Sequence, residues 1–205
     1  MKRRVITISR EYGSGGHAIG ESVASSLGIP FYDKKILEIV SQRSGLDETV
    51  IEEQGEHAAT GFLYGLAASI SYGYGYNVGA TGSMILPDQI NAFQTELIGE
   101  LADKESCVII GRCSDYILRK RDDCLHVFIH ADMENKKSRV AKEYGIAMED
   151  AEAQIKDRDK KRARYYQHVT DRTWGVAKNY HLCLDSGVLS APACVDAILY
   201  LFKHI

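Results

Sequence analysis

The chain has 205 residues and a formal net charge of −3, and its length is typical of one domain with a substantial core. The charge gives no overall attraction to nucleic acid or to an anionic membrane. None of the five cysteines belongs to a C-x-x-C pair, which argues against a zinc ribbon or a thioredoxin motif. Because no stretch approaches the roughly 20 apolar residues of a membrane helix, we expect a cytoplasmic protein without a membrane partner.

The front of the chain predicts a strand, a glycine-rich loop, a helix, a second strand and a second helix. The β-branched run RVITIS, residues 4–9, is typical of a strand that is buried on both faces. Apolar residues recur on one face of the helix expected at 17–28, and Gly28 is a natural cap for its end. Residues 29–33 are predicted to form the second strand, and the helix at 34–45 again closes on a glycine.

The rest of the chain continues this alternation after an interruption. Residues 47–58 are predicted to form an acidic helix, and the Tyr- and Gly-rich residues 61–84 a flexible connection without a persistent period. The further elements that periodicity predicts are strands at 107–112, 125–131 and 180–186, and helices at 88–105, 114–120, 134–145, 148–169 and 191–205.

Strands that alternate with helices predict an α/β fold in which a parallel sheet lies between two helical layers, because parallel crossovers need a helix. In open sheets of this kind, ligands bind at the carboxyl ends of the strands. Asp33, Arg112 and Asp185 each follow a predicted strand at that edge. We therefore expect the chemically important side chains to gather there, next to the glycine-rich loop.

The sequence YGSGG, residues 12–16, joins the first strand to the first helix. Backbone N–H groups and the positive end of the helix dipole can hold phosphate there, and glycines let the backbone curl around the anion. The phosphate-loop pattern is G-x-x-x-x-G-K-[ST]. With Gly15 as its second glycine, Arg10 stands at the first glycine. Gly16 then occupies the lysine position of the pattern, and His17 occupies the position of the hydroxyl-bearing Ser or Thr. The alternative is that these residues form only a tight turn.

The helix predicted at 148–169 carries the basic stretch KDRDKKRAR. Such runs are usually solvated helix faces, and nucleic-acid binding has weak support in a chain with a net negative charge. A third interpretation is a lid, because Arg158 and Arg162 lie four residues apart on one face. Guanidinium groups there could bind transferring phosphates bidentately. Combined with the glycine loop, the lid is the interpretation that we favour.

Three segments together resemble the cytidylate kinase-like family, a divergent branch of the nucleoside monophosphate kinases with the P-loop fold. They are ITISREYGSGGHAIGESVASSLGIPFYDKKIL, VIIGRCSDYIL and DRDKKRARYYQHVTDRTWGVAKNYHLCLDS. The resemblance implies a phosphotransferase that uses ATP and Mg²⁺ and moves the γ-phosphoryl group to a small acceptor such as CMP. It implies a small-molecule nucleotide partner and no nucleic acid, and it leaves a homo-oligomer open.

The resemblance also implies how the chain is divided. We expect one kinase-like domain over residues 1–205. Its core would comprise residues 1–45, 88–145 and 178–205. A mobile acceptor-binding section is expected at about 46–87, and a helical lid at about 146–177.

The family's functional residues can be matched to this chain one by one. The phosphate loop matches Gly13, Ser14, Gly15, Gly16 and His17. Asp33 matches the acid that begins the monophosphate-binding region, and Arg112 matches an arginine that contacts the acceptor monophosphate. Arg139 and Arg158 match arginines that reach the phosphates, and we expect them, with Arg10 and Arg112, to carry the catalytic charge.

Four positions depart from the family pattern. Gly16 replaces the loop lysine, and Lys34 replaces a hydroxyl-bearing residue after the acid. Arg162 stands where a lid acid contacts the cytidine ribose, and Tyr165 stands where a substrate-binding arginine would be expected. We assign Arg162 to the nucleotide side of the site and Tyr165 to the acceptor side, and the identity of the acceptor stays open.

The missing lysine calls for another cation, since phosphoryl transfer needs positive groups around the transferred phosphate. The hypotheses are Arg10, which leaves the first strand directly into the loop, His17, which opens the helix, and a lid arginine. No dedicated metal site is predicted, and Mg²⁺ would be held by phosphate oxygens, water, Ser14 and Asp33. Without a replacing cation, the chain would be a nucleotide-binding module with little or no turnover.

Overall fold

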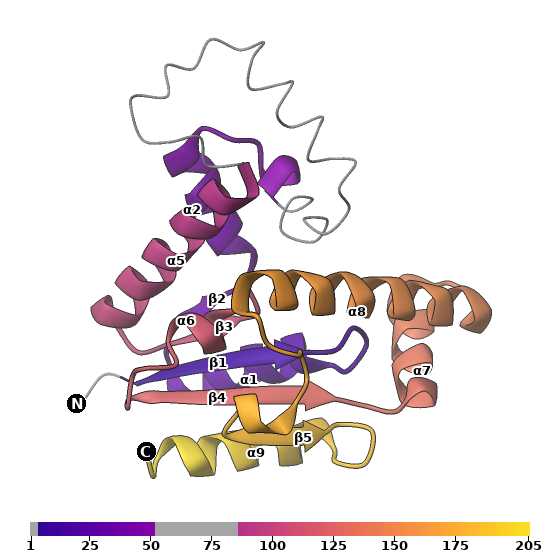
Figure 1. Cartoon of the computed structure of the whole chain (residues 1–205). Coiled ribbons are helices and arrows are strands. Elements are labelled where there is room, and N and C mark those ends of the chain that lie inside the picture. Colours follow the sequence, from indigo (N-terminus) through magenta and orange to yellow (C-terminus); the bar gives the residue numbers. More distant parts are fainter. Residues whose placement is uncertain (1–3, 52–85) are drawn as a thin grey trace, which may run out of the picture.

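The computed structural model describes residues 4–51 and 86–205. At its centre is a five-stranded sheet with the order β2-β3-β1-β4-β5, in which every pair of neighbours is parallel. The strands are β1 Val5–Arg10, β2 Phe31–Tyr32, β3 Cys107–Ile110, β4 Cys124–His130 and β5 Leu182–Asp185. Each coincides with a strand that the sequence predicts. The strand that leads into the glycine loop, β1, lies in the middle of the sheet (Figure 1).

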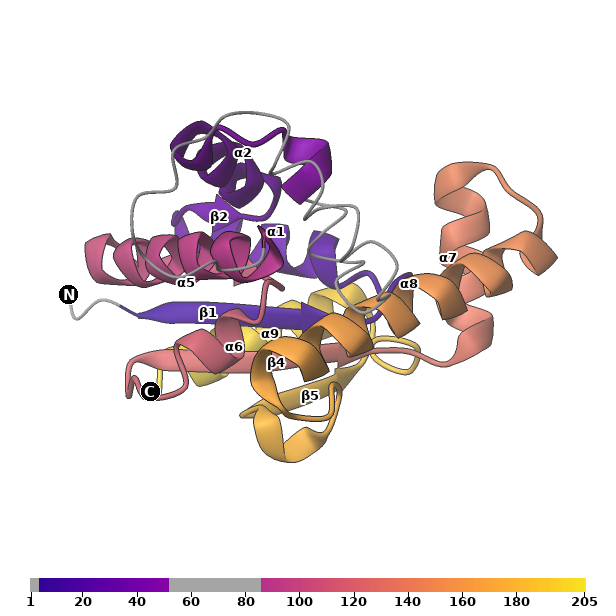
Figure 2. The ribbon, with the colours of Figure 1, turned by 45° about the horizontal axis from the view of Figure 1, so that its top comes forward.

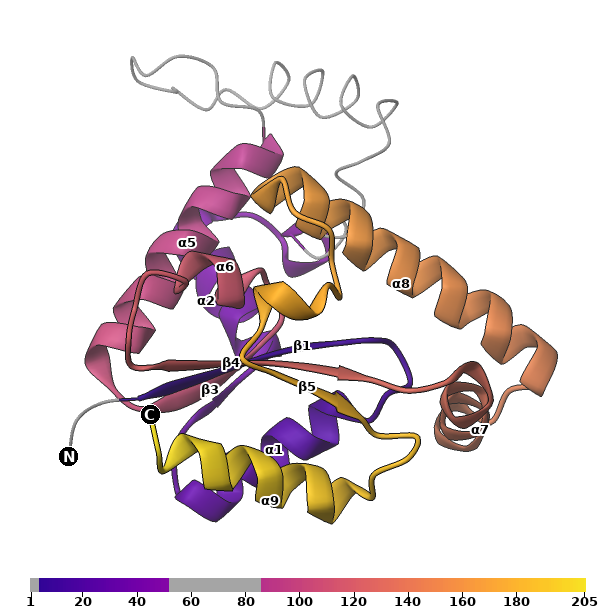
Figure 3. The same cartoon turned by 60° about the horizontal axis from the view of Figure 1, so that its bottom comes forward.

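Helices cover both faces of this sheet. The helices include α1 Gly16–Leu27, α2 Lys34–Ser44, α5 Leu86–Lys104, α6 Ser114–Ile117, α7 Met133–Tyr144, α8 Met148–Thr170 and α9 Ala191–Phe202, with a short 3₁₀ helix, η1 Ala177–Asn179, before β5. Figure 3 shows α1 and α9 on one face and α2, α5 and α6 on the other. The predicted arrangement of a parallel sheet between two helical layers is therefore confirmed.

Alternate residues of the strands contribute to two separate cores, because successive side chains of a strand point to opposite faces. Along β1, Ile6 and Ile8 pack with α1 and α9, whereas Val5 packs with α2 and α5. Along β3, Val108 and Ile109 divide between the two cores in the same way. This double burial explains the nearly unbroken β-branched run from which β1 was predicted.

Glycines set both ends of the helix that follows the loop. α1 begins at Gly16, directly after Gly15, whose φ is 73°. It ends at the cap residue Gly28, whose φ of 62° is the left-handed conformation that closes many helices. The first-turn N–H groups of α1, which have no partner within a helix, are thereby placed at the carboxyl end of β1.

The helix predicted as a lid, α8, lies against this edge of the sheet. It runs from α7, beyond the carboxyl ends of β1 and β4, back toward α5 and α6 (Figures 1 and 2). The Asp159 carboxylate accepts a hydrogen bond from the Tyr12 N–H at 2.7 Å. The Arg162 guanidinium donates to the Arg10 carbonyl at 3.1 Å. The basic helix is thus in direct contact with the glycine loop.

The acceptor-binding section expected at about 46–87 lies outside the described residues, apart from its two ends. The division of the chain into core, insertion and lid stays a prediction. Across the described ranges, no helix combines the length and the apolar character that crossing a bilayer requires.

Candidate functional site

The glycine loop is a tight turn with two residues in the left-handed region. The angle φ is 79° at Gly13 and 73° at Gly15, values that residues with a Cβ reach only with strain. The Ser14 side chain is buried, and its hydroxyl donates to the Glu11 carbonyl at 2.8 Å. The serine therefore braces the loop from within. The N–H groups of Tyr12, Ser14 and Gly16 already donate within the protein, so an anion would be held by other N–H groups of the loop and of the first turn of α1.

Three predicted site residues meet beside the start of α1. The carboxylate of Asp33, the residue between β2 and α2, lies 3.1 Å from His17 Nε2. The same carboxylate lies 3.9 Å from Arg10 Nη2. The His17 side chain is 55% exposed, whereas that of Arg10 is 20% exposed. Two of the hypothetical replacements for the loop lysine therefore face one carboxylate.

Arg139 reaches the loop from α7. Its guanidinium donates to the Gly13 carbonyl at 3.3 Å and to the Ser186 hydroxyl at 3.2 Å, and also to the Ser186 carbonyl. The Ser186 hydroxyl in turn donates to the Ser14 carbonyl at 2.6 Å. These bonds join the loop to α7 and to the end of β5, and they commit much of the Arg139 guanidinium to backbone oxygens.

The two predicted lid arginines lie over the ring of Tyr12, a loop residue. The guanidinium carbon of Arg158 is 4.7 Å from the ring centroid, and that of Arg162 is 5.7 Å from it, distances at which a cation is attracted to an aromatic face. The Tyr144 ring stacks on Tyr12 at 6.1 Å. The structure therefore brings both arginines to the glycine loop.

Lys136, on α7, is a loop contact that the sequence analysis does not identify. Its Nζ lies 3.0 Å from both Glu11 Oε2 and Asp159 Oδ2, and its side chain is only 7% exposed. Burial by itself lowers the pKa of Lys136, but the hydrogen bonds to Glu11 and Asp159 outweigh it and raise the pKa. Helical spacing is the sequence signal that could have identified Lys136 as buried, because it lies four residues from the buried Val140 on the same helix face.

The connection after β3 is a turn of three consecutive left-handed residues. The angle φ is 66° at Gly111, 55° at Arg112 and 53° at Cys113. A residue with a Cβ in this region costs about 1–2 kcal/mol, so the surrounding structure must hold the turn in place. The buried carboxylate of Asp115, in the next turn, accepts a hydrogen bond from the Tyr166 hydroxyl at 2.7 Å. α8 therefore braces the turn that carries Arg112.

Arg112 and Tyr165, both assigned to the acceptor side, are neighbours. Burial raises the pKa of Tyr165, and the Arg112 charge acts in the opposite direction. The Tyr165 hydroxyl donates to the Gln94 side chain of α5 at 3.2 Å. The structure thus groups these two residues at the end of α8 that faces α5 and α6.

A cavity of about 460 Å³ opens beside the glycine loop. The loop, α1, α7 and the connection from β5 to α9 form its walls. Its lining residues are Ser14, Gly15, Ala18, Ile19, Arg139, Lys142, Glu143, Ser186 and Ala191. A mainly aliphatic wall with a few charged groups at its rim is suited to a flat ring with a polar edge.

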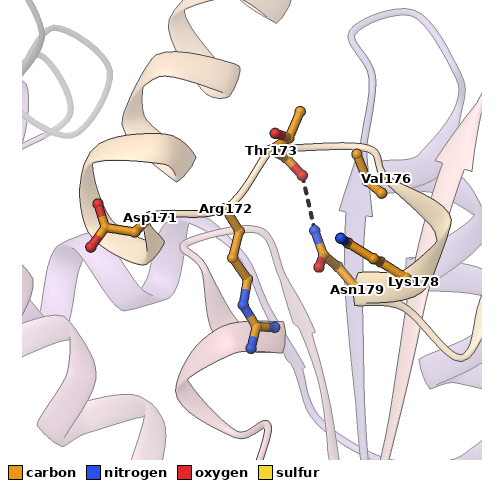
Figure 4. A pocket seen from close by; sticks show the side chains of 6 residues that line it. All are labelled: Asp171, Arg172, Thr173, Val176, Lys178 and Asn179. Atoms are coloured by element: carbon orange, nitrogen blue, oxygen red, sulfur yellow. Dashed lines mark hydrogen bonds between the residues drawn. The ribbon is translucent and has the colours of Figure 1, made fainter.

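A second cavity, of about 470 Å³, lies in the segment between α8 and β5 and shares no lining residue with the first. Figure 4 shows its walls, in which the Asn179 amide donates to the Thr173 carbonyl at 2.9 Å. The Arg172 guanidinium lies 5.1 Å from the centroid of the Tyr116 ring on α6. The six lining residues are Asp171, Arg172, Thr173, Val176, Lys178 and Asn179.

The donor set at the loop fits a magnesium ion that a nucleotide brings with it. Within residues 4–51 and 86–205, no group of three His, Cys, Asp or Glu side chains could hold a metal ion. Mg²⁺ keeps several waters and binds through one or two carboxylates together with substrate phosphates. Asp33 offers such a carboxylate beside the loop, whereas the Ser14 hydroxyl is turned toward the Glu11 carbonyl.

Solved structures share the fold of this chain. An uncharacterised protein from Eubacterium ventriosum ATCC 27560 has a TM-score of 0.72 and 24% identity, over 99% of this chain and 100% of its own. A gluconokinase from Sinorhizobium meliloti 1021 has a TM-score of 0.54 and 15% identity, over 99% and 97%. A shikimate kinase from Acinetobacter baumannii, in complex with shikimate, has a TM-score of 0.51 and 15% identity, over 99% and 94%. These likenesses establish the fold.

Comparison of the sequence identifies a family but no individual curated relative. No curated protein matches the chain. A family model described as the cytidylate kinase-like family matches residues 5–188. That range contains the glycine loop, the left-handed turn with Arg112 and the whole of α8. The chain therefore belongs to the cytidylate kinase-like family, as the resemblance of its three segments predicts.

Proposed function

We propose that this protein is a phosphotransferase that moves the γ-phosphoryl group of ATP to a small acceptor, a nucleoside monophosphate such as CMP. The observation that carries the proposal is the pairing, at one edge of the sheet, of a glycine loop and a strained turn that presents an arginine. β1 and β3, which lead into these two features, are adjacent strands. Membership of the cytidylate kinase-like family supports the same reaction class.

The donor nucleotide fits the loop and the cavity beside it. Backbone N–H groups at the start of α1 suit a polyphosphate, and the cavity of about 460 Å³ has room for a base. Ala18 and Ile19 of α1 and Ala191 of α9 give it aliphatic surface, and Lys142 adds a positive charge at its rim. ATP would bring Mg²⁺, which adds positive charge to its phosphates, and Asp33 is the carboxylate that could hold it.

The acceptor fits on the other side of the loop. Arg112 provides a guanidinium that can bind a phosphate monoester bidentately. The departures at Lys34, Arg162 and Tyr165 lie in the region that recognises the acceptor in the family. The base of the acceptor therefore has to be determined by the test below. The gluconokinase and the shikimate kinase that share the fold are named for other acceptors, and gluconate and shikimate therefore belong in the test.

The chemistry asks the protein to hold two anions in line and to neutralise charge. An oxygen of the acceptor phosphate forms a bond to the γ-phosphorus, the bond from that phosphorus to the bridging oxygen breaks, and ADP leaves with that oxygen. Arg158 and Arg162 lie at the loop on α8, where they can neutralise the equatorial oxygens. No side chain has to form a covalent intermediate.

The test is turnover of magnesium–ATP against CMP, dCMP, UMP, AMP, GMP, gluconate and shikimate, with thermal unfolding followed on the same samples. We expect turnover of about 1–100 s⁻¹ with one nucleoside monophosphate. Saturation with ATP at about 100 times its Kd should stabilise the fold by about 2.7 kcal/mol.

An alternative is a nucleotide-binding module without turnover, which the glycine at position 16 favours because the pattern has a lysine there. Stabilisation by ATP without transfer to any acceptor would support that module and contradict the kinase. Absence of any stabilisation by ATP or ADP would contradict both, and would leave the glycine loop as a turn between a strand and a helix.

A further inference from the structure

Arg10 and Gly16, which stand at the first-glycine and the lysine positions of the phosphate-loop pattern, are in direct contact in this chain. A Cβ atom built on Gly16 would lie 2.6 Å from Arg10 Cβ and 3.0 Å from Arg10 Cγ. These are the inner atoms of the arginine side chain, which cannot move away as its outer end could. The arginine therefore occupies the space into which a side chain at position 16 would project, and any residue larger than glycine there would force the strand or the loop to shift.

The Arg10 side chain continues from Gly16 toward the end of β3. Its Nη1 lies so close to Gly111 that a Cβ atom there would clash with it, and its Nη2 lies 3.9 Å from the Asp33 carboxylate. The guanidinium is thus located between the loop and the turn that carries Arg112. In the proposed reaction, this is the space between the donor and the acceptor.

Three of the other cations around the loop, Lys136, Arg139 and His17, contact protein groups, as Arg10 does through Asp33. Lys136 is 7% exposed between two carboxylates, at 3.0 Å from each. Arg139 donates to the carbonyls of Gly13 and Ser186. His17 is more than half exposed, with its Nε2 at 3.1 Å from Asp33. Arg10 combines a stem fixed by packing against Gly16 with a guanidinium directed to the acceptor side.

We propose that Arg10 and Gly16 are a reciprocal exchange of the glycine and the lysine of the phosphate loop. The cation comes from the last residue of β1 instead of the first turn of α1, and it reaches the β- and γ-phosphates of the nucleotide from there. The proposal rests on the proposed kinase function for the identity of the anion. Its packing half, the exclusion of a side chain at position 16 by Arg10, does not depend on any ligand.

The packing half is tested by a cycle of variants in the absence of nucleotide. Gly16 starts a helix without a left-handed φ, so alanine there should be tolerated once the arginine is gone. We expect G16A to lower Tm in the parent chain, and to leave Tm unchanged or raise it when added to R10G. G99A, in α5 with no atom within 4 Å of the new Cβ, is the matched control and should behave alike in both backgrounds. An equal loss of Tm from G16A in both backgrounds would overturn this half.

The charge half is tested with variants that keep the stem of the arginine. R10Q retains Cβ and Cγ against Gly16 and loses the charge, whereas R10K retains both. We expect R10Q to lower turnover with magnesium–ATP by at least about 100-fold and R10K to stay within about tenfold of the parent. R119A is the control: it removes an exposed arginine whose guanidinium lies over the Tyr116 ring, and it should leave turnover unchanged.

The decisive variant restores the common pattern. R10G/G16K should turn over at least about tenfold faster than R10G. The lysine side chain at position 16 would project into the space that the Arg10 side chain no longer fills, and it would restore the positive charge. Parental turnover and ADP stabilisation in R10Q would overturn the exchange while the kinase function stands. A parent that neither binds nor turns over nucleotide would instead overturn the proposed function and the phosphate role together, and the G16A cycle would still decide the packing half.

Discussion

Arg112 combines a side chain that the proposed reaction needs with a backbone conformation that costs free energy. With φ at 55°, its Cβ is brought close to the following carbonyl oxygen. Glycine adopts the same conformation without this cost. Function and stability are therefore opposed at one residue.

Replacing Arg112 by glycine should separate the two effects. We expect R112G to raise the free energy of unfolding by up to about 1 kcal/mol, measured in urea, while turnover falls by at least about 100-fold. D171G is the matched control, because Asp171 also has a left-handed φ, 54°, at the end of α8. It should gain stability and keep parental turnover. Loss of stability in R112G together with full activity would contradict this account.

His126, on β4, is a buried imidazole that must stay neutral. It is 4% exposed, its Nδ1 lies 2.8 Å from the Thr7 hydroxyl, and its ring stacks on His181 at 4.7 Å. Among the described residues, its Nε2 has no hydrogen-bond partner, so a charged imidazolium, which carries a proton on both ring nitrogens, would leave one buried N–H without an acceptor. Burial, followed by the nearby His181, lowers the pKa of His126 from 6.5 to about 4.

This depressed pKa predicts a loss of stability in acid. The folded pKa lies below the unfolded one, so the unfolded chain takes up the proton first as pH falls. The free energy of unfolding therefore has its full value above about pH 6.5. It decreases by about 3 kcal/mol in total as the pH falls from there to 4. Urea unfolding between pH 7.5 and 4 should show a flatter pH dependence for H126Q than for the parent. H204Q, at an exposed histidine, is the control, and the same slope in all three proteins would contradict the prediction.

At the scale of elements, one buried lysine joins three segments. Glu11 belongs to the loop, Lys136 to α7 and Asp159 to α8. Removal of one partner from a buried ion pair leaves a charge without compensation, and is far more costly than removal of an exposed one. The basic helix is therefore held on the loop by a contact that is sensitive to single substitutions.

We expect K136M to lower the free energy of unfolding by about 3 kcal/mol, since two carboxylates would stay close together without their cation. Amide hydrogens of α8 should exchange faster in this variant than in the parent. K137M changes the adjacent lysine, whose closer partner Glu134 is 76% exposed, and should cost less than about 1 kcal/mol. Equal effects of the two variants on stability and exchange would show that the buried contact does not hold α8.

At the scale of the whole molecule, the architecture follows from patterns that are local in the sequence. Each predicted strand is a short run with apolar side chains on both faces, and this character is visible without knowledge of its neighbours. Parallel strands with helical crossovers then leave few topologies. For the same reason, the sequence predicts that Asp33 and Arg112 lie at one edge of the sheet.

The contacts that shape the site are not local, and the sequence indicates them weakly. Lys136 has the appearance of one more polar residue on a charged helix, because its two carboxylates are supplied by segments that only the fold brings together. The left-handed conformation of Cys113 has no local cause, since it is not a residue type that favours positive φ. The sequence shows that Arg10 and Gly16 depart from a pattern, but only their packing shows that the departures are connected.

A phosphate loop with a side chain at both position 10 and position 16 is crowded at its base. A lineage that moves between a lysine loop and this arginine loop therefore passes through glycine at both positions, and such an ancestor has neither cation. Selection for transfer would disfavour that ancestor, so each arrangement is inherited as a unit. The two kinds of loop should then mark separate branches of descent, with few sequences between them.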